Sequence, residues 1–147
     1  MRTVIIFAMV LGICWVISPA FAQREVESND LKISPNKYKN SSIILKDVFI
    51  NFRSGIPAAL TAAGYTTQKY ISFGCKKAGM RCFMRRNAAN EKLITQFSNG
   101  DRITIYGTVK QPKAKVKRGG GRVTNRYKLD MYLIVATKVD KGWTEGP

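Results

Sequence analysis

Hydrophobic and polar residues alternate strictly along the segment 101–110, Asp-Arg-Ile-Thr-Ile-Tyr-Gly-Thr-Val-Lys. A period of two is typical of a half-buried β-strand, with one apolar and one polar face. Gly107 replaces an apolar residue in the inner row, as at a β-bulge or a bend of a barrel. The turn signal Asn99-Gly100-Asp101 precedes the run. We therefore predict a strand over 101–110 that begins directly after a turn.

A second alternating run follows a basic, glycine-rich gap at 111–125. Its apolar members are Leu129, Met131, Leu133, Val135 and Val139. We predict a last strand over 126–139, and we expect these two consecutive strands to close a small barrel.

The segment 41–53 is predicted to form a long strand with apolar residues on both faces: Val48, Ile50 and Phe52 on one, Leu45 and Phe49 on the other. A long, bent strand shared by the two halves of a closed barrel has this double pattern. A buried helix is the alternative, but the enrichment in β-branched and aromatic residues favours a strand.

Small residues dominate the connection 54–66, where 57–63 could form one or two helical turns that stop at Gly64. Residues 70–86 are predicted to form a hairpin. A turn centred between Ala78 and Gly79 sets Cys75 directly opposite Cys82, within the range of a disulfide. An even pair of cysteines in an exported chain also favours this bond.

The predicted hairpin has one face for the core and one facing outward. The core face holds Ile71, Phe73, Cys75, Cys82 and Met84, and the other holds Tyr70, Ser72, Lys76, Arg81, Phe83 and Arg85. Asn87 then offers a helix cap, and the spacing of Leu93, Ile94 and Phe97 predicts a short helix over 88–97.

Strand, hairpin, short helix, strand, basic loop and strand is the element order of the OB-fold, a five-stranded Greek-key barrel. The segments Asn99–Val109 and Leu133–Val139 resemble those of exported bacterial OB-fold proteins of the tRNA-anti-like kind, over roughly 38–140. The expected fold class is thus all-β with one short helix, a five-stranded OB-fold-like Greek-key barrel. An SH3-like barrel and an α+β sheet remain alternatives.

The N-terminus has the pattern of a secretory signal peptide: Arg2, an apolar run from Val4 to Ile17, and Ala20-Phe21-Ala22. The expected organisation is a signal peptide at 1–22, a flexible lead at 23–40, the barrel at 41–140 and a tail at 141–147. An uncleaved anchor and a lipoprotein at Cys14 are the alternatives. After cleavage we expect a periplasmic or secreted protein without a transmembrane segment.

The chain has 25 Lys and Arg, 9 Asp and Glu and no His, for a net charge of +16. Such an excess favours a polyanionic partner, namely single-stranded nucleic acid or an anionic envelope glycan or lipid. Ligand in OB-folds usually lies on strands 2 and 3, between the loops joining strands 1–2 and 4–5. The expected polyanion-binding residues are Lys76, Arg81, Phe83, Arg85, Lys110, Lys113, Lys115, Lys117, Arg118, Arg122 and Arg126.

Each of these features also has a structural interpretation. The basic loop could be a solvated segment, and Tyr70 and Phe83 could pack under 54–66 or a partner subunit rather than stack on bases. The alternative function is a structural or interaction module that binds an envelope protein through 54–66 and the hairpin.

Nothing in the sequence indicates catalysis. Without His the usual general base and metal ligand are absent. Ser34-Pro35-Asn36-Lys37 matches Ser-x-x-Lys, but this motif is common by chance and needs further elements. The acidic residues are scattered, so we expect no metal site, no cofactor and no enzymatic activity.

Overall fold

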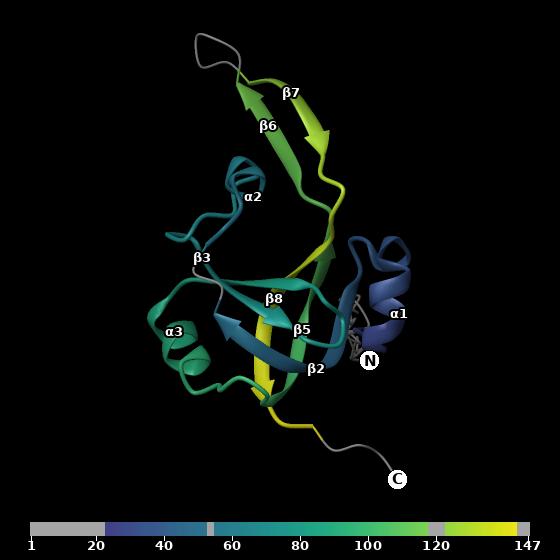
Figure 1. Cartoon of the computed structure of the whole chain (residues 1–147), viewed down its shortest axis with the longest axis vertical. Coiled ribbons are helices and arrows are strands. Elements are labelled where there is room, and N and C mark those ends of the chain that lie inside the picture. Colours follow the sequence, from purple (N-terminus) through teal and green to yellow (C-terminus); the bar gives the residue numbers. More distant parts are fainter. Residues whose placement is uncertain (1–22, 53–54, 118–122, 144–147) are drawn as a thin grey trace, which may run out of the picture.

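Strand β2 (Ser42–Phe52) is the longest strand of the computed structural model, which describes residues 23–52, 55–117 and 123–143 (Figure 1). The first half of β2 pairs antiparallel with β5 (Arg102–Lys110), and its second half pairs antiparallel with β3 (Tyr70–Cys75). A register shift between Ile50 and Phe52 marks an irregularity in the β2–β3 ladder. One bent strand therefore serves both sides of the barrel, as its double apolar pattern predicted.

The five barrel strands are joined in the order β2-β3-β4-β8-β5, and the β2–β5 pairing closes the ring. Strand β4 (Arg81–Arg85) pairs antiparallel with β3 and parallel with β8 (Leu133–Lys141), which pairs antiparallel with β5. This is the strand order of the OB-fold. The predicted fold class, an all-β five-stranded OB-fold-like barrel, is confirmed.

Alternate residues of the barrel strands fill its interior. Fully buried side chains include Ile43, Leu45, Phe49, Phe73, Ile103 and Ile105. The ring of Phe49 stacks on Phe73 with centroids 5.6 Å apart and lies 5.7 Å from Phe97, which follows α3. The barrel is therefore filled by side chains, as small barrels are.

Two short helices lie where the sequence predicted them. Helix α3 (Ala88–Ile94) begins at Asn87, whose side chain accepts a hydrogen bond from the backbone N–H of Asn90 at 2.8 Å. Helix α2 (Ala58–Ala62) lies in the β2–β3 connection and is followed by Gly64, whose φ of +95° suits glycine.

The N-terminal segment differs from the flexible lead expected at 23–40. It forms β1 (Arg24–Val26), helix α1 (Ser28–Ile33) and a 3₁₀ turn, η1 (Pro35–Tyr38). Strand β1 adds to β2 in parallel, and Val26, Leu31 and Tyr38 are buried. These apolar side chains are widely spaced among polar ones, so no periodic pattern reveals them. The predicted signal peptide, 1–22, and the end of the tail, 144–147, lie outside the described residues.

The basic segment after β5 differs from the expected irregular loop. Strands β6 (Lys113–Lys117) and β7 (Val123–Lys128) pair as a separate antiparallel hairpin, which extends from the barrel (Figure 1). The predicted last strand, 126–139, is accordingly divided between β7 and β8. Leu129 lies between the two and is buried.

The β3–β4 hairpin keeps the predicted division of its side chains between two sides, but Ser72 and Phe83 on the expected outward side are buried, and the register differs. Cys82 is opposite Phe73 rather than Cys75, and the backbone N–H of Cys75 donates to the carbonyl of Met80 at 3.0 Å. A shift of two residues leaves each side chain on its expected side of the hairpin.

Cys75 and Cys82 are therefore diagonal neighbours with free thiols, whose Sγ atoms are 2.9 Å apart. The hydrogen bond to Cys82, together with burial, raises the pKa of the Cys75 thiol well above its usual value. The disulfide stays a prediction.

Gly107 lies at the predicted irregularity, where the β5–β8 register shifts between Tyr106 and Gly107. A Cβ atom at this position would stand 2.6 Å from the carbonyl oxygen of Val135 and 2.9 Å from Cγ2 of Ile134. We expect Gly107→Ala to lower the free energy of unfolding by about 1–3 kcal/mol, the usual range for overpacking. Urea denaturation measures this change. The matched control is Gly55→Ala, where a Cβ meets nothing within 4 Å. Equal stability of the two variants would contradict a steric role for Gly107.

Candidate functional site

The β6–β7 hairpin places four cations on one of its faces. In its antiparallel register Lys113 is opposite Lys128, and Lys115 is opposite Arg126. Side chains of directly opposed residues project to the same side of a ladder, and residues two apart on one strand share that side. We call Lys113, Lys115, Arg126 and Lys128 the cationic face; all four side chains are exposed.

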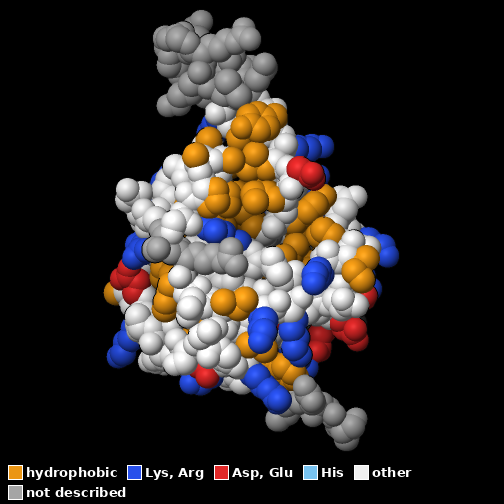
Figure 2. Space-filling model, viewed as in Figure 1, with side chains coloured by type: hydrophobic (Ala, Val, Ile, Leu, Met, Phe, Trp, Pro, Cys, Tyr) orange, Lys and Arg blue, Asp and Glu red, His pale blue; other side chains and the backbone are white. Residues whose placement is uncertain are grey.

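The reverse face of the hairpin is apolar. Ala114 is fully buried and is opposite Tyr127, whose side chain is 50% exposed. Ala114 belongs to a cluster with Leu60 of α2, Phe83 of β4, Leu129 and Leu133. Figure 2 shows hydrophobic side chains gathered along the hairpin and beside α2 on the face that it presents. The hairpin is therefore fixed to the barrel by one face and offers the other to solvent.

The cationic face has no nearby counter-charge on its own segment. The sequence contains no Asp or Glu from residue 102 to residue 129. Within the part of the chain that the structure describes, none of the four cations forms an ion pair. Like charges directly opposite each other in a sheet are destabilising. The pairs 113–128 and 115–126 therefore create positive potential at a net cost to the hairpin.

The aromatic face of the β3–β4 hairpin is covered rather than open. Phe83 is fully buried, with the ring centroid of Tyr65 at 4.8 Å and that of Tyr70 at 6.1 Å. Burial raises the pKa of the Tyr65 phenol above its ordinary value, and Tyr70 adds to this effect. The expected exposure of Phe83 is thus contradicted, because Leu60 and Tyr65 of the β2–β3 connection pack onto its ring. Phe83 instead packs under the segment 54–66, as the structural interpretation of this residue proposed.

Three of the other expected cations, Arg81, Arg85 and Lys110, lie at the ends of barrel strands. Arg81 is opposite Leu133 at the base of the β6–β7 hairpin, and its guanidinium donates to the carbonyl of Gly55 at 2.7 Å. Lys110 ends β5, and its Nζ donates to Oδ1 of Asn40 at 3.3 Å. Arg85 ends β4 opposite Tyr70.

Lys76 lies away from the cationic face. Its backbone N–H donates to the carbonyl of Val48 at 2.9 Å, and Val48 pairs with Arg102 at the start of β5. The β6–β7 hairpin follows the other end of β5. Arg118 and Arg122 lie outside the described residues, as does the side chain of Lys117.

Lys128 was not among the expected residues, because it lies two residues inside the predicted last strand, beyond Arg126 at the edge of the basic gap. A signal was present: Lys113, Lys115 and Lys117 alternate with Ala114 and Val116, as in a strand with one basic face. A matching alternation at Arg126 and Lys128 would have indicated the partner strand.

Two further features of the described residues concern metal ions and membranes. In 23–52, 55–117 and 123–143 no three Cys, Asp or Glu side chains are grouped so that they could hold a metal ion. The same ranges contain no helix of the length and apolar character that crossing a membrane requires.

No protein-family model matches the chain, and no curated protein matches its sequence. Among solved structures, a protein described as an aspartyl-tRNA synthetase from Leishmania major aligns with a TM-score of 0.49 and 6% identity, over 82% of this chain and 21% of that one. An OBody bound to hen egg-white lysozyme aligns with a TM-score of 0.43 and 13% identity, over 78% of this chain and 88% of that one. RecJ from Thermus thermophilus aligns with a TM-score of 0.40 and 8% identity, over 82% and 16%. The chain thus spans about a fifth of the synthetase, and the OB-fold assignment rests on its own strand order.

Proposed function

We propose that this protein binds a polyanion, single-stranded nucleic acid or an anionic envelope glycan or lipid, through the cationic face of the β6–β7 hairpin. The observation that carries the proposal is the register that sets Lys113 against Lys128 and Lys115 against Arg126, with no acidic residue from 102 to 129. An anionic ligand would relieve the repulsion within both pairs.

The paired strands also favour binding on entropic grounds. An irregular loop that becomes ordered when it binds a ligand loses conformational entropy, at a cost of about 1–2 kcal/mol per residue. The β6–β7 ladder, and the packing of Ala114 on Leu60 and Phe83, order much of this backbone beforehand. Residues two apart on a strand are spaced by about 6.7 Å, so each strand offers a short row of cations to a repeating anion.

The proposal includes export and action without catalysis. Its basis is the N-terminal pattern of Arg2, an apolar run and Ala20-Phe21-Ala22, together with a chain that lacks His. The protein would then work in the periplasm or outside the cell. In that oxidising setting the adjacent thiols of Cys75 and Cys82 would form the predicted disulfide.

A salt titration tests this function. Fluorescence anisotropy would follow the binding of a labelled single-stranded DNA, with heparin as the glycan probe. Four phosphate contacts predict a slope of log K against log salt of about −3, since each contact contributes about −0.7 on single strands. A flat dependence, or the absence of binding to both probes at low salt, would refute nucleic acid and glycan as ligands of the cationic face. A response to heparin alone would assign the face to a glycan.

A further inference from the structure

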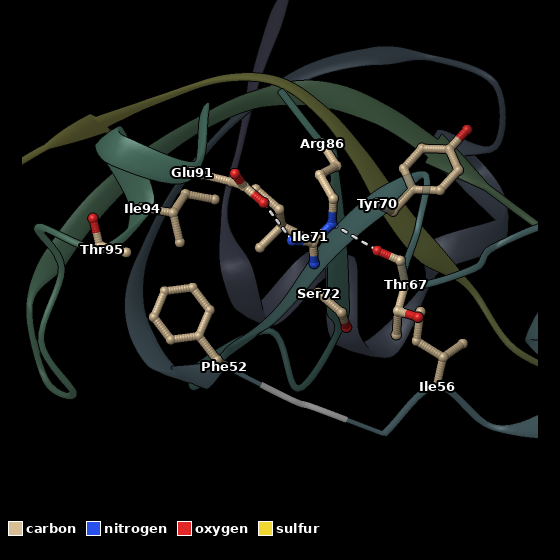
Figure 3. A pocket seen from close by; sticks show the side chains of 10 residues that line it. All are labelled: Phe52, Ile56, Thr67, Tyr70, Ile71, Ser72, Arg86, Glu91, Ile94 and Thr95. Atoms are coloured by element: carbon tan, nitrogen blue, oxygen red, sulfur yellow. Dashed lines mark hydrogen bonds and ion pairs between the residues drawn. The ribbon is translucent and has the colours of Figure 1, made fainter. Parts of the chain in front are cut away.

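A cavity of about 470 Å³ lies between β3, the β2–β3 connection and α3. Its walls are mainly apolar and come from Phe52, Ile56, Ile71 and Ile94, with Tyr70, Thr67 and Thr95 beside them (Figure 3). Cavities of about 300–1,000 Å³ with apolar walls and few polar groups are typical of small-molecule sites. None of the four residues of the cationic face lines it, so the two features are separate.

Ser72 is the unusual member of this lining. Its side chain is 5% exposed, and its hydroxyl is the buried side-chain polar atom that lacks a hydrogen-bond partner among the described residues. Figure 3 shows this hydroxyl directed into the space between Phe52, Thr67 and Ile56. A buried polar group without a partner costs about 1–3 kcal/mol. A ligand group that hydrogen-bonds to it would recover that loss.

The charged residues at the rim are already paired. Arg86 donates from Nε to the carbonyl oxygen of Thr67 at 2.6 Å and forms an ion pair with Glu91 (Figure 3). Because this pair is neutral as a whole, the cavity favours neither an anion nor a cation. The side chain of Phe52, which is 44% exposed, offers an aromatic surface at the mouth.

We infer that this cavity binds a neutral, mainly apolar small molecule, aromatic in part, with one hydroxyl or carbonyl group that pairs with Ser72 Oγ. The ring of such a ligand contacts Phe52 and the isoleucine side chains, and its polar group reaches Ser72. This site does not depend on the proposed polyanion function. Because no net charge is involved, its affinity is insensitive to salt.

The test compares 2-naphthol with naphthalene as probes of the full chain, by NMR shifts of the Ser72 and Ile94 amides. We expect 2-naphthol to bind more tightly, and Ser72→Ala to weaken it about fivefold to tenfold, the value of one neutral hydrogen bond. Naphthalene affinity should not fall in this variant. The melting temperature of Ser72→Ala should equal or exceed that of the wild type, since an unsatisfied hydroxyl is removed.

Two further variants keep the result interpretable. Ser98→Ala, at an exposed turn position, should change neither affinity nor melting temperature, and Thr67→Phe should block both probes by filling the mouth. If Ser72→Ala lowers the melting temperature and leaves 2-naphthol affinity unchanged, the hydroxyl is structural and the inference fails. It fails equally if neither probe shifts the cavity amides. Salt-independent 2-naphthol binding alongside absent DNA binding would support this site and refute only the polyanion function.

Discussion

Replacing Lys113, Lys115, Arg126 and Lys128 together by glutamine should weaken the binding of single-stranded DNA several-hundredfold at about 0.1 M salt. Each phosphate contact contributes about 0.7 to the slope of log K against log salt, so four contacts are worth nearly three decades of affinity between about 0.1 and 1 M. Anisotropy titrations at several salt concentrations measure both the affinity and the slope. The slope should fall towards zero in the variant.

The control variant carries glutamine at Lys32, Lys37, Lys69 and Lys92, four exposed lysines outside the β6–β7 hairpin. It has the same net charge as the test variant, so equal losses in both would attribute binding to net charge and contradict a defined face. Thermal unfolding separates function from folding. The test variant should be at least as stable as the wild type, because the opposed like charges are gone.

Asp47→Ala should destabilise the protein by about 3 kcal/mol or more, the largest stability effect that we expect for a single substitution. The carboxylate is fully buried in β2 and accepts four hydrogen bonds. Oδ1 accepts from the N–H of Val48 at 2.6 Å and of Lys77 at 2.8 Å, and Oδ2 from the N–H of Ala78 at 2.8 Å and the Ser28 hydroxyl at 3.0 Å. Hydrogen bonds to charged groups are worth about 1.5–3 kcal/mol, and each donor left unpaired adds a penalty.

Thermal unfolding measures this effect, which should lower the melting temperature by about 10 °C or more. The melting temperature of Asp47→Asn should lie between those of the wild type and Asp47→Ala. The amide keeps one oxygen as an acceptor, but its NH₂ group faces hydrogen-bond donors and cannot accept from them. The matched control is Asp30→Asn on α1, an exposed acidic residue, which should leave stability unchanged. Wild-type stability of Asp47→Ala would show that the β3–β4 turn and α1 are held without this carboxylate.

The local sequence pattern was sufficient to predict the secondary structure of segments with a regular pattern of buried residues. Alternation predicted β5, and apolar residues on both faces with β-branched and aromatic enrichment predicted β2. The small residues before Gly64 predicted α2, and Asn87 predicted the start of α3. Gly107 was placed at an irregularity for the same reason, since it interrupts an apolar row. These features depend on residues close in sequence, and strand order then followed from the sequence of elements.

The candidate site was predictable only in part. The basic segment and its position between the last two barrel strands were evident, and Lys113, Lys115 and Arg126 were among the expected residues. Their arrangement as one face was not, because the β6–β7 register also sets Lys128 opposite Lys113. Phe83 was expected at the surface. Its ring is covered by Leu60 and Tyr65, which lie about twenty residues away in the sequence, and the pattern within the hairpin does not reveal that contact.

The sequence by itself determined the first four barrel strands, the helices α2 and α3, the OB-fold order of the barrel elements and the excess of positive charge. It did not reveal β1, α1 or the β6–β7 hairpin. The tertiary structure decided the pairing registers, the covering of Phe83, the anchoring of α1 by Asp47 and the burial of the Ser72 hydroxyl. The physical reason is that periodicity records how one segment divides between core and solvent. The pairing register of two strands, and the side chains that cover a residue such as Phe83, depend on segments far apart in the chain. No local pattern encodes how such segments pack together.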